Sequence, residues 1–113
     1  MNKINKNNWN KLIEDLKVAK KLAREASKWE DGGTANLDYV YIRLPYARER
    51  KVKEVLEEAG LYVSKVSHPY YGMHFKIVGV CGGQGNANIR ANNAVKDYLK
   101  SQGWEVGIIY ITD

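Results

Sequence analysis

Residues 37–44, with the sequence Leu-Asp-Tyr-Val-Tyr-Ile-Arg-Leu, decide the fold class of this chain. Apolar side chains at positions 40, 42 and 44 alternate with tyrosine or arginine at positions 39, 41 and 43. This period of two, in β-branched and aromatic residues, predicts a strand with one buried face. Pro45 follows directly, and we expect it to open a helix, because the first helical position needs no N–H donor. Gly60 is expected to end that helix.

The chain beyond this helix predicts the rest of a four-stranded sheet. Leu61 to Ser67 and Met73 to Val80 are strand-like and flank a turn, so they predict a hairpin. A further helix is expected after the loop at residues 81–86, running to about Gln102, and a last strand spans residues 104–111. We therefore predict an α+β fold, a ferredoxin-like βαββαβ antiparallel sheet. Its first and third strands are adjacent at the centre, and both helices lie on one face.

An added N-terminal helix is predicted from Lys3 to Trp29, because apolar residues recur there at spacings of three and four. We divide the chain into this amphipathic helix, residues 1–30, packed on a ferredoxin-like domain, residues 31–113. The apolar stripe of the helix has to be buried, and we expect it to cover the second face of the sheet. The alternative is an open face that binds RNA through basic and aromatic residues. Those residues are Tyr39, Tyr41, Arg43, His74 and Lys76.

Two glycine-rich loops, residues 31–36 and 81–88, form the candidate ligand site. The predicted topology brings both loops and the C-terminal residues 110–113 to one end of the sheet. Glycine lets backbone N–H groups approach a ligand closely, and the second loop opens a helix whose N-terminus attracts anions. The alternative is that the glycines only turn the chain, with an asparagine at position 86 or 88 as N-cap. The candidate ligand- or partner-binding residues are Thr34, Asn36, Asp38, Gln84, Asn86, Asn88 and Arg90.

Basic residues gather at the start of the helix that follows Pro45. The residues of this basic patch are Arg43, Arg48, Arg50, Lys51 and Lys53. Positive charge at a helix N-terminus opposes the macrodipole, so these residues do not stabilise the helix. They are expected to meet an acidic partner or a phosphate. The alternative is a solvated surface, relieved by the glutamates of the same helix.

Composition and motifs favour a small binding protein over an enzyme. The chain has 113 residues, the size of one domain, and its net charge of +5 favours anionic partners or serves solubility alone. The glycine loops match neither the P-loop nor the dinucleotide fingerprint. Cys81 has no clearly placed base and is interpreted as a small core residue. We expect no catalytic set, metal or cofactor. Without an apolar run or signal-like start, we expect no membrane contact and a location in the cytoplasm of a host cell.

Two short motifs carry a resemblance to a known group of proteins. Residues 31–38 read Asp-Gly-Gly-Thr-Ala-Asn-Leu-Asp, and residues 83–86 read Gly-Gln-Gly-Asn. With them, residues 31–113 resemble small accessory proteins from phages and mobile elements of Gram-positive bacteria. Such proteins often inhibit host defence, and anti-CRISPR proteins are among them. The resemblance implies this role and no catalytic residues.

We therefore expect a small, basic, non-enzymatic phage-type protein that binds and inhibits a host defence component. The positive net charge argues against mimicry of DNA, so the target is an acidic protein surface or the bound guide RNA. The alternative is a sponge, as a homo-oligomer, that sequesters a signalling nucleotide in a pocket formed by the two glycine-rich loops. A weak enzyme acting on phosphate esters is a third hypothesis.

Overall fold

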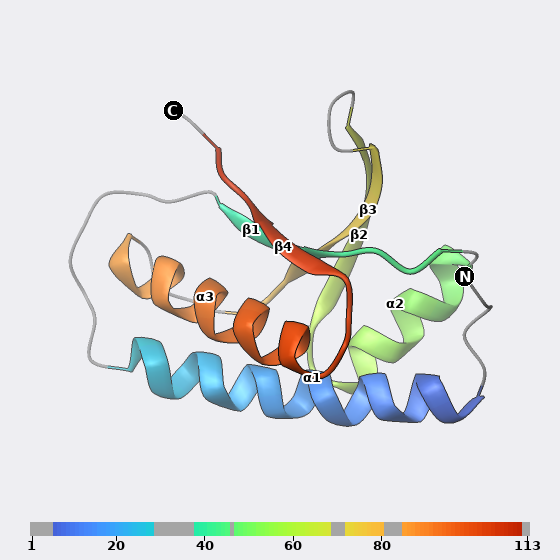
Figure 1. Cartoon of the computed structure of the whole chain (residues 1–113), viewed down its shortest axis with the longest axis horizontal. Coiled ribbons are helices and arrows are strands. Elements are labelled where there is room, and N and C mark those ends of the chain that lie inside the picture. Colours follow the sequence, from blue (N-terminus) through green and yellow to red (C-terminus); the bar gives the residue numbers. More distant parts are fainter. Residues whose placement is uncertain (1–5, 29–37, 46, 69–71, 81–84, 112–113) are drawn as a thin grey trace.

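The computed structural model describes residues 6–28, 38–45, 47–68, 72–80 and 85–111, and shows an α+β fold (Figure 1). Its elements are α1 (Lys6–Ser27), β1 (Tyr39–Ile42), α2 (Glu49–Glu58), β2 (Tyr62–His68), β3 (Gly72–Val78), α3 (Asn86–Ser101) and β4 (Val106–Ile109). The four strands form an open antiparallel sheet in the order β2-β3-β1-β4. The expected adjacency of the first and third strands at the centre is confirmed.

The register of the sheet separates two faces along β1. Tyr41 pairs with Lys76 of β3 on one side and with Gly107 of β4 on the other. Because side chains alternate along a strand, Val40 and Ile42 point to the opposite face from Tyr41. Both are fully buried. The first face therefore carries the core, and the second face carries the aromatic and basic residues of β1 and β3.

The prediction that Pro45 opens the second helix is wrong. The helix begins at Glu49, and Arg48 stands at its N-cap with extended backbone angles. The Ala47 N–H donates to the Leu44 carbonyl oxygen at 3.1 Å, which closes a turn around residues 44–47. Proline suits the second position of such a turn as well as the first position of a helix, because both fix φ near −65°. The predicted helix end is correct, since Gly60 follows α2 with φ of +81°.

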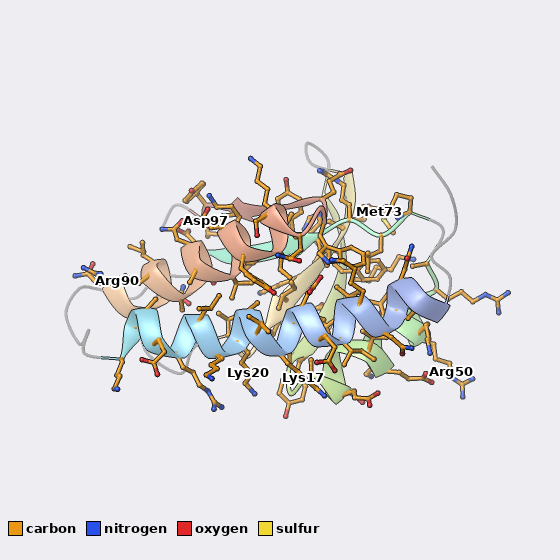
Figure 2. All side chains as sticks on the ribbon, turned by 60° about the horizontal axis from the view of Figure 1, so that its bottom comes forward. Lys17, Lys20, Arg50, Met73, Arg90 and Asp97 are labelled. Atoms are coloured by element: carbon orange, nitrogen blue, oxygen red, sulfur yellow. The ribbon has the colours of Figure 1, made fainter. Side chains whose placement is uncertain are left out.

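The prediction that the N-terminal helix covers the second sheet face is also wrong. All three helices lie on the first face, and α1 packs against α3 and α2 (Figure 1). Within the described residues α2 and α3 do not contact each other, and α1 runs across the helical layer between them (Figure 2). The apolar stripe of α1 therefore packs into the groove between the two separated helices, over the core. In the described part of the chain it is buried there without contact with the second face of the sheet.

Apolar residues form one part of the contact between α1 and the rest of the domain. Leu12 and Leu16 are fully buried in the same hydrophobic cluster as residues of the sheet and of both other helices. Small residues line the α1 stripe further on, with Ala19 and Ala23 also fully buried, so the helices can approach closely. The first helix is therefore part of the single hydrophobic core described here.

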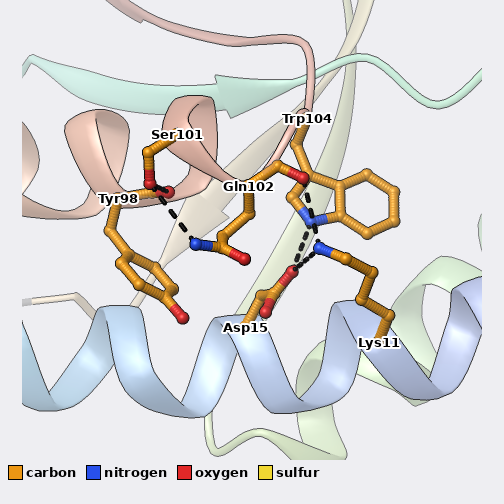
Figure 3. A network of polar contacts seen from close by, with 6 residues as sticks. All are labelled: Lys11, Asp15, Tyr98, Ser101, Gln102 and Trp104. Carbon is orange, nitrogen blue, oxygen red and sulfur yellow. Dashed lines mark hydrogen bonds and ion pairs between the residues drawn. The ribbon is translucent and has the colours of Figure 1, made fainter.

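Two lysines of α1 bind the carboxyl ends of the other helices. Lys20 Nζ donates to the Gly60 carbonyl oxygen at 2.6 Å, directly after α2. Lys11 Nζ donates to the Gln102 carbonyl oxygen at 3.1 Å, directly after α3 (Figure 3). A helix leaves its last carbonyl groups without partners and carries partial negative charge there, which cations stabilise. The same helix thereby places a cation at the carboxyl end of each neighbour, on a carbonyl just beyond the last helical residue.

Candidate functional site

The predicted loop site falls largely outside the described residues. Thr34, Asn36 and Gln84 lie outside them, as does Cys81. The predicted convergence at this end of the sheet is nevertheless confirmed by the residues that flank the loops. The side-chain amides of Asn88 and Asn92, on α3, both donate to the Asp38 carbonyl oxygen, at 3.2 and 3.0 Å. The start of β1 and the start of α3 therefore meet.

The residues at this end bind one another. The Asp38 carboxylate accepts a 2.7 Å hydrogen bond from the Ile111 N–H, which brings the chain after β4 to the same place. Gly85, with φ of +58°, stands at the N-cap of α3, so neither predicted asparagine occupies that position. Asn88 instead holds β1. The contribution of Asn92 was not predicted; its signal in the sequence is its position one helical turn after Asn88.

Asn86 and Arg90 are exposed on the first turn of α3. The backbone of Asp38 is joined to the same turn through Asn88, and its carboxylate accepts from the Ile111 N–H at the same end of the sheet. A negative charge at this place opposes the binding of a phosphate. The described geometry of this end is therefore that of a structural junction.

A compact ring cluster lies on the second sheet face. His74 is 2% exposed and packs between Tyr39, at a ring-centroid distance of 5.8 Å, and Tyr41, at 5.4 Å. Its Nδ1 lies 3.1 Å from the Gly72 carbonyl oxygen, which can only accept, so Nδ1 carries a proton. In the neutral ring Nε2 then accepts a hydrogen bond from the Tyr39 hydroxyl, at 2.8 Å. Both ring nitrogens are engaged in holding the cluster.

Two cations cover the tyrosine rings of this cluster. Lys76 Nζ lies 4.8 Å from the Tyr39 ring centroid, and the Arg43 guanidinium lies 4.9 Å from that of Tyr41. Tyr39 is only 9% exposed. Nucleic-acid bases stack on exposed ring faces, and these faces already meet cations or His74. Among the described residues the second face is open, as the RNA-binding alternative requires. The rings of this cluster are covered, whereas Tyr62, on the same face of β2, is 65% exposed.

The predicted basic patch spreads over different sides of the molecule. Arg43 faces the second side of the sheet and contacts Glu105, with 3.4 Å between Nη1 and Oε2. Lys51 turns toward α1 and lies 5.9 Å from the Trp9 ring centroid. Arg50 lies 3.8 Å from the Glu54 carboxylate on α2, whereas Arg48 and Lys53 are exposed. Of this patch, Arg43 is the residue that borders a cavity.

A cleft of about 330 Å³ lies at the other end of the sheet from the glycine loops. It is formed between the hairpin of β2 and β3 and the connection from β1 to α2. The residues that line it are Arg43, Leu44, Pro45, Ala47, Lys65, Met73, His74 and Phe75. Sequence reasoning placed Arg43 in a basic patch but missed the cleft. The sequence carried only a weak signal for it, since Lys65 interrupts the apolar positions Val63, Phe75 and Ile77 on the inner side of the hairpin.

The cleft combines apolar walls with positive charge. Leu44 and Phe75 are buried, whereas Met73 is 52% exposed at the opening. Arg43 and Lys65 supply two cations, and no carboxylate lines the cleft among the described residues. Within the described ranges no group of three metal-ligating side chains exists, and no buried polar side-chain atom lacks a hydrogen bond. The chemistry of the cleft is that of binding an apolar group next to an anion.

No protein-family model matches this chain, and neither a curated protein nor a solved structure is significantly similar to it. In the part of the chain that the structure describes, no helix is both long and apolar enough to cross a membrane.

Proposed function

We propose that this chain is a small, basic, non-enzymatic protein of the phage accessory type that binds an acidic surface of a host defence component and inhibits it. The observation that carries the proposal is the cleft at the hairpin end, where Arg43 and Lys65 border apolar walls without a described carboxylate. We assign the fold to the ferredoxin-like class with an added N-terminal helix, on the strand order and on the helices gathered on one face.

Charge supports an acidic partner. The chain carries 18 lysines and arginines against 13 aspartates and glutamates, which gives a net charge of +5. This charge attracts anionic partners at long range and raises the rate at which they associate. Sequestration of a signalling nucleotide at the glycine loops is less well supported. Asp38 places a negative charge there, and Asn88 is already bound to the backbone of β1.

The test is a phage-plating assay in Gram-positive host strains, each carrying one nucleic-acid-targeting defence system. Expression of the chain should restore plating of a targeted phage in at least one strain. The double variant Arg43→Glu/Lys65→Glu should lose this restoration, because it reverses both charges at the cleft.

The matched control is Lys21→Glu/Arg24→Glu, which makes the same change in net charge at exposed positions of α1. It should restore plating as the unaltered chain does. Plating that stays low in every strain contradicts inhibition of host defence. Equal loss in both double variants would show that net charge alone acts, and the role of the cleft would be rejected.

A further inference from the structure

The cleft at the hairpin end has the dimensions of a site for one large side chain. Its volume, about 330 Å³, is at the lower end of the roughly 300–1,000 Å³ that ligand pockets span. Phe75 and Leu44 form buried apolar walls, and Pro45 and Ala47 close the side toward α2. Met73 is half exposed at the opening, and its flexible thioether adapts to different apolar partners.

Arg43 is held in place at this opening before any partner arrives. Its guanidinium lies 4.9 Å from the Tyr41 ring centroid, and its Nη1 lies 3.4 Å from the Glu105 carboxylate. A good charge-assisted hydrogen bond is about 2.7–2.9 Å long, so the contact with Glu105 is weak. The guanidinium has five N–H donors, and a second carboxylate can share it. A fixed donor loses little conformational entropy on binding.

Lys65 provides the second cation from a different strand. It pairs in register with Phe75, across β2 and β3, and its side chain is exposed. Arg43 directly follows β1 and faces the second side of the sheet, whereas Lys65 shares the first side with Phe75, so the two cations border the cleft from different sides. This arrangement complements an apolar side chain whose neighbours along a peptide are carboxylates.

We propose that the cleft binds an acidic peptide segment, with one large apolar side chain in the cleft and flanking carboxylates against Arg43 and Lys65. The inference rests on the proposed function and deepens it by naming the chemistry of the partner. A peptide is favoured over single-stranded nucleic acid, because the tyrosine rings beside the cleft are covered by Lys76 and Arg43. Base stacking requires such rings to be accessible.

The experiment measures fluorescence anisotropy with the full chain and a labelled peptide of alternating aspartate and glutamate around one central phenylalanine. Two matched peptides separate the contributions of the apolar side chain and of the carboxylates to binding. One has alanine in place of the phenylalanine, and the other has asparagine and glutamine in place of the aspartates and glutamates. Each change should weaken binding about 10- to 100-fold, since an aromatic side chain and a charge-assisted contact each contribute on that scale. A labelled uridine oligonucleotide of equal charge is the competing probe.

The single variant Lys65→Glu should weaken binding of the acidic peptide, and Lys21→Glu serves as the matched control with unchanged binding. If a cleft variant fails to fold, the comparison of the three peptides still tests the proposal, because it changes only the peptide and uses the unaltered protein. Equal affinity for the phenylalanine and alanine peptides overturns the proposal, as does tighter binding of the oligonucleotide. Peptide binding without restored phage plating supports the partner chemistry and rejects the defence role. Restored plating with no peptide binding rejects the partner chemistry alone.

Discussion

Replacement of Asp15 by alanine should unfold the protein more easily, because this side chain joins α1 to the segment after α3. Asp15 is 7% exposed, and its Oδ2 accepts from Lys11 Nζ at 2.6 Å and from Trp104 Nε1 at 2.8 Å (Figure 3). The alanine variant leaves the indole N–H without its acceptor at a partly buried place. It also removes the anion that holds Lys11 over the Trp104 ring.

The magnitude follows from the two contacts. A hydrogen bond to a charged group contributes about 1.5–3 kcal/mol when one partner is removed and the other stays buried. Lys11 is about half exposed, so its ion pair adds only about 0.2–1 kcal/mol. Because the two contacts share one oxygen, they are not additive, and we expect a loss of about 2–3 kcal/mol in the free energy of unfolding. For a domain of about 100 residues this lowers Tm by about 8–12 °C.

The assay is urea unfolding followed by far-UV circular dichroism, since the fluorescence of Trp104 would itself respond to the loss of its partner. Glu14→Ala is the matched control on the same helix, because Glu14 is 74% exposed and lies 3.9 Å from Lys17. Its effect should stay within about 0.5 kcal/mol. An Asp15→Ala midpoint equal to that of the control, with an unchanged slope, would refute the view that this network fixes α1.

Two further substitutions test the helix end and the ring cluster. Gly60→Ala should cost about 1–2 kcal/mol by thermal unfolding, because φ is +81° and the new Cβ would lie 2.6 Å from Lys20 Nζ; an unchanged Tm would contradict this reading. Tyr39→Phe should cost about 1–2 kcal/mol in urea, because it removes the hydroxyl that binds the buried His74 ring. A neutral effect would mean that another group satisfies the histidine nitrogen.

The role of Pro45 could not be predicted from the residues around it alone. Pro45 was predicted to open the helix after β1, but a turn and a helix start both accept proline. The hydrogen bond from Ala47 to the Leu44 carbonyl decides between them, and it forms because the chain must cross from the sheet to the helical layer. The helix consequently begins four residues later, at Glu49.

The candidate site likewise has one part that could be predicted from the sequence and one part that could not. The junction at Asp38, Asn88 and Ile111 was predictable, because strand order alone brings those ends together. The cleft was not predictable, because its walls come from the hairpin and from the β1–α2 connection, and no local pattern encodes their separation. Arg43 was recognised as a cation, but its place in the same cleft as Lys65 depends on how far the hairpin extends beyond β1.

Residue patterns were enough to predict the α+β class, the central pairing of the first and third strands, and the end of the second helix at Gly60. The class and the helix end depend on residue periodicity and on backbone freedom at single positions, which are local properties. The strand pairing follows from the order of the elements and the right-handed crossover rule. The place where the apolar stripe of α1 is buried could not be predicted from these patterns, because it depends on how the other helices are arranged in space. That stripe fits either an open sheet face or a groove between helices, and the choice depends on contacts between residues as distant as Asp15 and Trp104. Because α1 occupies the groove, none of the helices in the described residues covers the second face of the sheet.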